Sequence, residues 1–248
     1  MAKVPNPLQI PAFRAYWAAR LTSTIAQMAM VIVIGWQVYD IARETMGVKE
    51  AALRLGIIGL VQFVPLFVLT LVSGWTADRL DRRWIARAAV ALELACALVL
   101  AWLAWRDSTT LMALYGVAAL LGVARAFAGP ALGALAPNLV PRNILPKAIA
   151  LSSIAWQSGV VIGPAVGGLL YAQVPWLPYA GSAALFGIAL ACLLAIGRVE
   201  RPDIGRSISP WKQMVEGLGY VRRNRLVLGA ISLDLFAVLL GGATAMLP

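Results

Sequence analysis

The sequence contains no histidine, only two cysteines and few charged residues for its length. Without histidine, neither a histidine-containing zinc site nor a Ser-His-Asp triad can be built. Cys96 and Cys192 both lie inside apolar runs, so they offer no disulfide framework and no metal-ligand spacing. No phosphate-binding sequence of the form G-x-x-x-x-G-K-[ST] is present. We therefore expect a protein that is not an enzyme and that uses no metal or other cofactor.

Polar surface is also scarce. Only 13% of the 248 residues are charged, and 61% are hydrophobic, whereas a soluble domain has about a quarter charged and half apolar residues. A water-exposed surface of this composition would aggregate. The excess apolar side chains are accounted for if the outer surface faces lipid. The composition therefore indicates an integral membrane protein.

Seven apolar segments are long enough to cross a bilayer, for which a helix needs about 20 residues. They cover about 15–41, 53–77, 84–105, 110–134, 146–172, 177–197 and 226–248. Within lipid each segment must satisfy its own backbone hydrogen bonds, so only helices are plausible at this length. The first segment is too long for a cleaved signal peptide, and Arg20 lies in its first half. We predict an all-α, polytopic membrane protein.

The basic residues are distributed unevenly between the two sides of the predicted spans. Sixteen lie on one side, Arg125 lies inside a span, and the other side has only Arg43, Lys49, Arg54 and Arg106. Because lysine and arginine accumulate on the cytoplasmic side, the bias predicts a multi-pass protein of the cytoplasmic (inner) membrane with a cytoplasmic N-terminus. This topology also explains the net charge of +10, so the charge does not indicate a nucleic-acid partner.

The longest polar connection divides the chain into three predicted parts. These are a six-helix transmembrane bundle over 1–198, a cytoplasmic linker over 199–225 and a further helix over 226–248. In the linker, Ser209 and Pro210 can cap and start a helix. Apolar residues then recur at helical spacing, at Trp211, Met214, Leu218 and Val221. We expect a short amphipathic helix on the membrane surface, acting either as a simple linker or as a regulatory or partner site.

An aspartate among arginines lies in the connection after the second span, which reads GWTADRLDRR over residues 74–83. Partly desolvated ion pairs at a membrane surface can break and re-form with other partners, so this cluster can act as a conformational gate. A simpler interpretation is a positively charged cytoplasmic loop. The gate candidates are Gly74, Asp78, Arg79, Arg82 and Arg83.

Glycines recur on the fifth predicted span, in the sequence GVVIGPAVGG over residues 159–168. A helix face almost without side chains allows another helix to pack closely, and an internal proline removes a backbone hydrogen bond and bends the helix. Such a helix is suited to rocking against a partner. The predicted packing residues are Gly159, Gly163, Pro164, Gly167 and Gly168.

Together with RAFAG at residues 125–129, these patterns resemble the major facilitator superfamily. The connection 74–83 is similar to its G-x-x-x-D-R-x-G-R-R pattern, with Asp81 in place of the second glycine. RAFAG is similar to its R-x-x-x-G motif, and 159–168 to the G-x-x-x-G-P-x-x-G-G motif associated with antiporters. The run 125–141 further resembles a subgroup of bacterial exporters that includes the enterobactin exporter and macrolide efflux proteins.

The resemblance implies a fold of twelve helices in two six-helix halves, with the substrate site between them. By this resemblance the chain supplies the N-terminal six-helix bundle and a seventh helix that begins the second half. We therefore expect a C-terminal half that is absent from this chain, which is then a fragment or a truncated gene product.

Ionisable residues inside membrane spans are costly and are functional candidates by default. Glu93 and Arg125 each lie about 13 Å from the predicted cytoplasmic ends of their spans, and Asp234 about 12 Å. We predict a proton relay in which protonation of a carboxylate beside Arg125 changes the charge of this layer. The alternative is a fixed ion pair between Glu93 and Arg125 that only holds two helices together. In the superfamily the third helix tends to lie outside the cavity, which counts against Glu93 as a direct carrier.

The first span is more polar than its neighbours. Polar side chains avoid lipid, so those in this span are candidates for a cavity wall, and an aromatic wall poor in arginine suits an amphiphilic organic solute. The candidate cavity residues are Gln27, Trp36, Gln37 and Asp40.

These features predict a secondary active transporter. It is expected to export a small drug-like or siderophore-like molecule by proton antiport with alternating access, with the solute, protons and the lipid bilayer as its partners. An importer or facilitator of the same fold is one alternative. A non-transporting membrane component, such as a sensor, an assembly subunit or a truncated product, is another.

Overall fold

The computed structural model describes residues 6–79 and 81–197, together with isolated positions between 219 and 236. Within the first range the side chains of residues 71, 74, 75 and 77–79 are not described. The chain divides into two compact units, Met1–Pro202 and Asp203–Pro248. Apart from the isolated positions, the predicted linker 199–225 and the predicted seventh span 226–248 lie outside the described residues.

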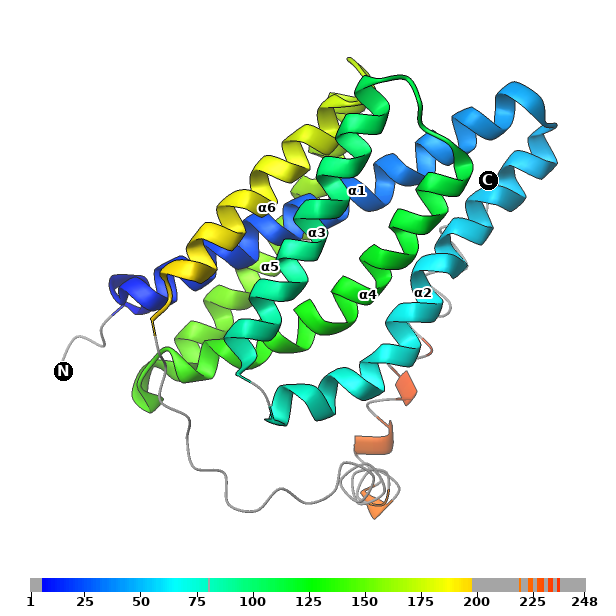
Figure 1. Cartoon of the computed structure of the whole chain (residues 1–248). Coiled ribbons are helices and arrows are strands. Elements are labelled where there is room, and N and C mark those ends of the chain that lie inside the picture. The colour runs from blue at the N-terminus through cyan, green and yellow to red at the C-terminus, as the bar shows by residue number, and fades with distance from the viewer. Residues whose placement is uncertain are drawn as a thin grey trace. The chain divides into compact units, whose positions relative to one another are not determined.

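The first unit is a bundle of six long apolar helices (Figure 1). They are α1 (Pro11–Thr45), α2 (Val48–Arg79), α3 (Arg82–Trp105), α4 (Leu111–Leu135), α5 (Leu145–Tyr171) and α6 (Leu177–Ala195). Each is long and apolar enough to cross a bilayer, and the described residues include no strand. The all-α, polytopic fold predicted from composition is therefore confirmed, and the first six predicted spans coincide with the six helices.

α1 extends beyond its predicted span at both ends. Its 35 residues correspond to about 52 Å of helix, which exceeds the roughly 30 Å hydrocarbon core. A helix of this length spans the core with a tilt or with its ends beyond the apolar layer.

Two of the helices begin after a polar residue whose side chain caps the first helical turn. The Asp81 carboxylate accepts the backbone N–H of Arg83 at 3.0 Å and so caps α3. The Thr110 hydroxyl accepts the N–H of Ala113 at 3.2 Å and caps α4. These side chains satisfy N–H groups that have no partner inside the helix. The tight turn before α3 therefore uses the aspartate that replaces a glycine of the family pattern.

The helices form a closed circuit of packed pairs. α1 packs on α6, α6 on α3, α3 on α4, α4 on α2, and α2 returns to α1. α5 lies mainly against α1, so α1 contacts more of the bundle than any other described helix. Figure 1 shows α1 crossing the bundle beside α5 and α6. The buried side chains of this unit come from all of these contacts and form one apolar core.

The glycine face predicted on α5 packs directly against α1. A Cβ atom added at Gly159 would lie 2.6 Å from the Thr24 Cβ, and one at Gly167 would lie 2.9 Å from the Ala29 Cα. At Gly168 the neighbour is instead the edge of the Trp36 indole, at 3.2 Å. Gly168 follows Gly167 directly and therefore projects about 100° around the helix. Pro164 lies inside α5, and the bend expected from it stays a prediction.

A second close approach joins α2 and α4. A Cβ atom added at Gly122 would clash with the Gln62 carbonyl oxygen. Because a backbone atom cannot move aside as a side chain can, this crossing also requires glycine. Gly122 was not predicted from the sequence, because it stands alone and belongs to no repeated spacing.

We predict that Gly163→Ala destabilises the protein and that Gly187→Ala does not. Both changes raise helix propensity by about 1 kcal/mol. At Gly163, however, the new methyl group would lie 2.6 Å from the Met28 Cβ and 2.7 Å from the Ile25 carbonyl oxygen, whereas nothing lies within 4 Å at Gly187. Overpacking of this kind costs about 1–3 kcal/mol. Thermal unfolding of both variants in one detergent is the measurement. A Gly163→Ala protein that melts at or above the wild-type temperature would contradict the close α1–α5 contact.

Candidate functional site

A buried carboxylate lies in the middle of the bundle. Glu93 of α3 is 0% exposed. The side-chain amide of Gln27 on α1 donates to the Glu93 Oε1 atom at 2.6 Å. The other carboxylate oxygen, Oε2, is buried and has no hydrogen-bond partner. A half-satisfied carboxylate at this depth is costly when ionised, and the vacant oxygen is a place where a proton can bind.

Arg125 supplies the positive charge of the same layer. It lies on α4, is partly buried, and interacts electrostatically with Glu93. No ion pair within 4.0 Å joins the two side chains in the described part of the chain. Glu93 is instead held directly by Gln27, a residue assigned from sequence to the cavity wall. Asp234, the third charged residue predicted in this layer, lies outside the described residues.

Arginines at the start of α3 bind the last carbonyl groups of α6. The Arg83 guanidinium donates to the Gly197 carbonyl and forms an ion pair with Asp81 at 2.6 Å. Arg87 donates to the carbonyls of Leu193 at 3.0 Å and Ile196 at 2.9 Å. The carbonyls at a helix C-terminus lack partners within the helix and carry partial negative charge. α3 therefore caps α6.

Arg82 makes a similar contact with a different helix. Its guanidinium donates to the Ala134 carbonyl near the end of α4, at 3.2 Å. Arg82 and Arg83 thus tie the start of α3 to the ends of two other helices. The described contacts give these two gate candidates a physical role as caps of helix ends.

The remaining gate candidates belong to α2. Gly74, Asp78 and Arg79 are helical positions whose side chains are not described. Asp81 and Arg87 were not among the gate candidates predicted from sequence. For Asp81 the signal was present, since an aspartate directly before a helix start is a common N-cap. For Arg87 no local signal existed, because its carbonyl partners lie more than a hundred residues later in the chain.

The candidate cavity residues on α1 separate into three places. Gln27 contacts Glu93, as described above. Gln37 is buried and accepts a hydrogen bond from the Tyr179 hydroxyl of α6 at 2.5 Å. Trp36 and Asp40 are exposed on α1 and meet Tyr171 at the end of α5. The structure thus brings two of the four residues together.

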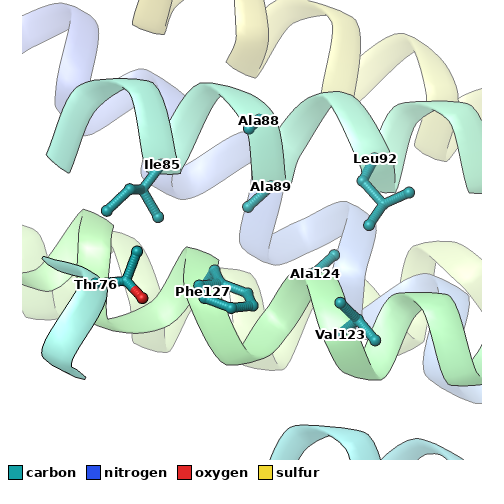
Figure 2. A pocket seen from close by; sticks show the side chains of 8 residues that line it. All are labelled: Thr76, Ile85, Ala88, Ala89, Leu92, Val123, Ala124 and Phe127. Atoms are coloured by element: carbon teal, nitrogen blue, oxygen red, sulfur yellow. The ribbon is translucent and has the colours of Figure 1, made fainter. Parts of the chain in front are cut away.

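An apolar cavity of about 240 Å³ lies elsewhere, between α2, α3 and α4. Figure 2 shows side chains of α3 facing those of α4, with Thr76 of α2 at one end. The Thr76 hydroxyl donates to the Val72 carbonyl at 2.8 Å, so it offers no free donor to a ligand. None of the predicted cavity residues lines this space. It is therefore distinct from the polar positions on α1.

The fold and its charged layer define a multi-pass helical membrane protein. Comparison with known proteins then identifies the family. The chain belongs to the transmembrane secretion effector family of the major facilitator superfamily, whose family model matches residues 3–246. This match confirms the superfamily predicted from the motifs. The family and its relatives are transporters and not enzymes.

Curated relatives cover nearly the whole chain. It is 28% identical to Macrolide efflux protein A of Streptococcus pyogenes over 241 residues, covering 94% of this chain and 55% of that protein. It is 30% identical to Enterobactin exporter EntS of Escherichia coli O1:K1 / APEC over 241 residues, covering 95% of this chain and 53% of that protein. These relatives confirm the predicted subgroup. The chain spans about half the length of the curated relatives it matches.

We predict that Arg87→Met loosens the end of α6. Methionine keeps much of the apolar length of arginine but removes the donors to the α6 carbonyls, a loss of roughly 1–2 kcal/mol. Hydrogen exchange followed by mass spectrometry should show faster exchange in peptides covering 186–197. Arg142→Met is the matched control, since Arg142 is exposed. Equal exchange in the two variants would show that the Arg87 contacts do not stabilise this helix end.

Proposed function

We propose that this chain forms one bundle of a secondary active transporter that exports a small organic molecule in exchange for protons. Three findings support the proposal. The family is named for secretion, the relatives are named as efflux and export proteins, and the bundle carries a half-satisfied carboxylate in its interior. Transport against a gradient needs an energy source, and a carboxylate that binds and releases protons supplies the coupling.

The observation that carries the proton-coupling proposal is the geometry of Glu93. Its Oε2 atom has no partner while its Oε1 atom is fixed by Gln27. Protonation makes the carboxyl group neutral and removes the cost of an unpaired buried charge. It also leaves the charge of Arg125 less compensated. Proton binding therefore changes the electrostatics between α1, α3 and α4, and a conformational equilibrium can follow the charge.

Alternating access needs some contacts that persist and others that break. The glycine contact between α1 and α5 joins backbones closely and is proposed as the surface on which these helices rock. The guanidinium caps on α4 and α6 lie at one end of the bundle and are proposed as the breakable contacts of the gate. Gly74, Asp78 and Arg79 of α2 are proposed to complete this gate.

The proposed location is the cytoplasmic membrane, with the N-terminus in the cytoplasm. The excess of basic residues on one side of the six helices supports this orientation. The proposed transport path lies between two bundles, as in the superfamily. This bundle forms one wall, carrying the cavity candidates of α1, and a second helical bundle forms the other.

We predict that Glu93→Gln abolishes the dependence of transport on a proton gradient. Glutamine keeps the size and the hydrogen bond with Gln27 but cannot exchange a proton. The measurement is gradient-driven uptake of candidate solutes into inverted membrane vesicles carrying the full-length gene product, repeated across a pH series. Asp234→Asn is expected to impair coupling as well. Glu50→Gln, which changes an exposed glutamate at the start of α2, is the control and should transport as the wild type does.

Each of two outcomes of this experiment would reject a different part of the proposal. If both Glu93→Gln and Asp234→Asn retain the wild-type pH dependence, the proposed proton relay is wrong. If the wild type accumulates solutes without any dependence on the gradient, the antiport proposal itself fails and facilitated transport replaces it.

A further inference from the structure

Two aromatic rings and a carboxylate meet at the end of the bundle that carries the α1–α2 connection. The Trp36 and Tyr171 ring centroids lie 5.9 Å apart, with the ring planes inclined by 50°. The Tyr171 hydroxyl donates to the Asp40 Oδ2 atom at 2.7 Å. Trp36 and Asp40 are one helical turn apart on α1, and Tyr171 is the last residue of α5. The three side chains therefore form one cluster across the α1–α5 contact.

The cluster is open to a ligand. Trp36 is 48% exposed although indole is a large, mostly apolar group, and Asp40 is exposed as well. The indole edge lies beside Gly168, where an added Cβ would be only 3.2 Å away, so the absence of a side chain leaves room for the ring in this position. The indole is thus held at its edge while its surface stays accessible.

The carboxylate of Asp40 has no cation as a partner. The Tyr171 hydroxyl occupies Oδ2, and no lysine or arginine lies within 4.0 Å of Asp40 in the described part of the chain. Arg43 follows one turn later on α1 without forming an ion pair with it. The site therefore offers a negative charge and two electron-rich ring faces, and its tyrosine hydroxyl already donates to the carboxylate.

We propose that Trp36, Tyr171 and Asp40 bind an organic cation, such as a protonated or quaternary amine with apolar substituents. The inference rests on the proposed function, in which this cation belongs to the exported solute. Aromatic faces attract cations through the ring quadrupole, and the carboxylate adds a direct charge interaction. A neutral or anionic solute would gain neither contribution. The cluster thus selects its ligand by charge, while the apolar ring surfaces accept substituents of varied shape.

A purely structural role of the cluster predicts a different result from mutation of the same residues. If the cluster only ties α1 to α5, its important element is the Tyr171–Asp40 hydrogen bond. Tyr171→Phe removes that bond and retains the ring. Under the binding proposal this variant keeps its affinity for a cation within about threefold, because both rings and the carboxylate remain. The thermal stability of the Tyr171→Phe variant separately measures how much the Tyr171–Asp40 hydrogen bond stabilises the fold.

The test is equilibrium binding of benzyltrimethylammonium to the purified full chain in nanodiscs of zwitterionic lipid, measured by calorimetry. Binding to empty nanodiscs is subtracted, and the neutral isostere neopentylbenzene is measured in parallel. We expect saturable binding of the cation only, weakened about tenfold or more by Asp40→Asn and by Trp36→Leu. Glu44→Gln is the matched control, since Glu44 is an exposed acid one turn beyond Asp40, and it should bind as the wild type does.

The outcomes separate this site from the transport proposal. Equal binding of the neutral isostere, no saturable binding, or equal losses in Glu44→Gln and Asp40→Asn would each overturn the cation site. If Asp40→Asn does not fold, Trp36→Leu decides in its place. Binding at equilibrium needs no proton gradient, so this test does not depend on the proposed proton relay. Gradient-driven export that persists without this binding would overturn the cation site alone, whereas binding without gradient-driven export would overturn the transport proposal.

Discussion

The bilayer interior offers no water to polar groups, so each one must find a partner within the protein. This constraint shapes α1, the most polar of the six helices. The hydroxyls of Ser23 and Thr24 bond back to the Arg20 carbonyl. The polar side chains of Tyr16 and Gln37 bond to residues of α5 and α6. The bonds of Tyr16 and Gln37 thereby tie α1 to α5 and α6. Against this background, the unpartnered oxygen of Glu93 is an exception that invites a functional explanation.

α1 also connects the proposed sites to each other. Gln27 holds the buried carboxylate. Of the proposed cation site, Trp36 lies about 13 Å and Asp40 about 20 Å further along the same helix. Between these positions, Gly163 and Gly167 of α5 lie against Met28 and Ala29 of α1. A shift of α1 that follows a change of charge at Glu93 would therefore alter the contact between Trp36, Asp40 and Tyr171. If both proposals hold, this arrangement would link proton and solute through one rigid element, which is a physical route for coupling.

The two kinds of helix contact differ in how readily they can break. At the glycine contact itself, backbones and short side chains meet closely. Hydrogen bonds of Tyr16 with Ser152 and of Tyr171 with Asp40 join the same two helices on either side of it. At the α6 end, Arg83 donates to the Gly197 carbonyl and Arg87 to the carbonyls of Leu193 and Ile196. Water or another protein surface can replace those donors only at the membrane boundary, where these residues lie in the predicted topology. In the predicted topology, the contacts proposed to break therefore lie at the membrane boundary, and the apolar contacts lie within the membrane.

By itself, the sequence determined the features that depend on local composition and spacing. Runs of apolar residues placed the six helices, the glycine spacing marked the packing face of α5, and the motifs indicated the superfamily. Isolated charges such as Glu93 stood out because any ionisable residue is conspicuous in an apolar run. Only the tertiary structure decided which residues meet: Gln27 with Glu93, Arg87 with the end of α6, and Tyr171 with both Trp36 and Asp40. Those pairs lie far apart in the chain, and their contact depends on how whole helices pack, which no local pattern encodes.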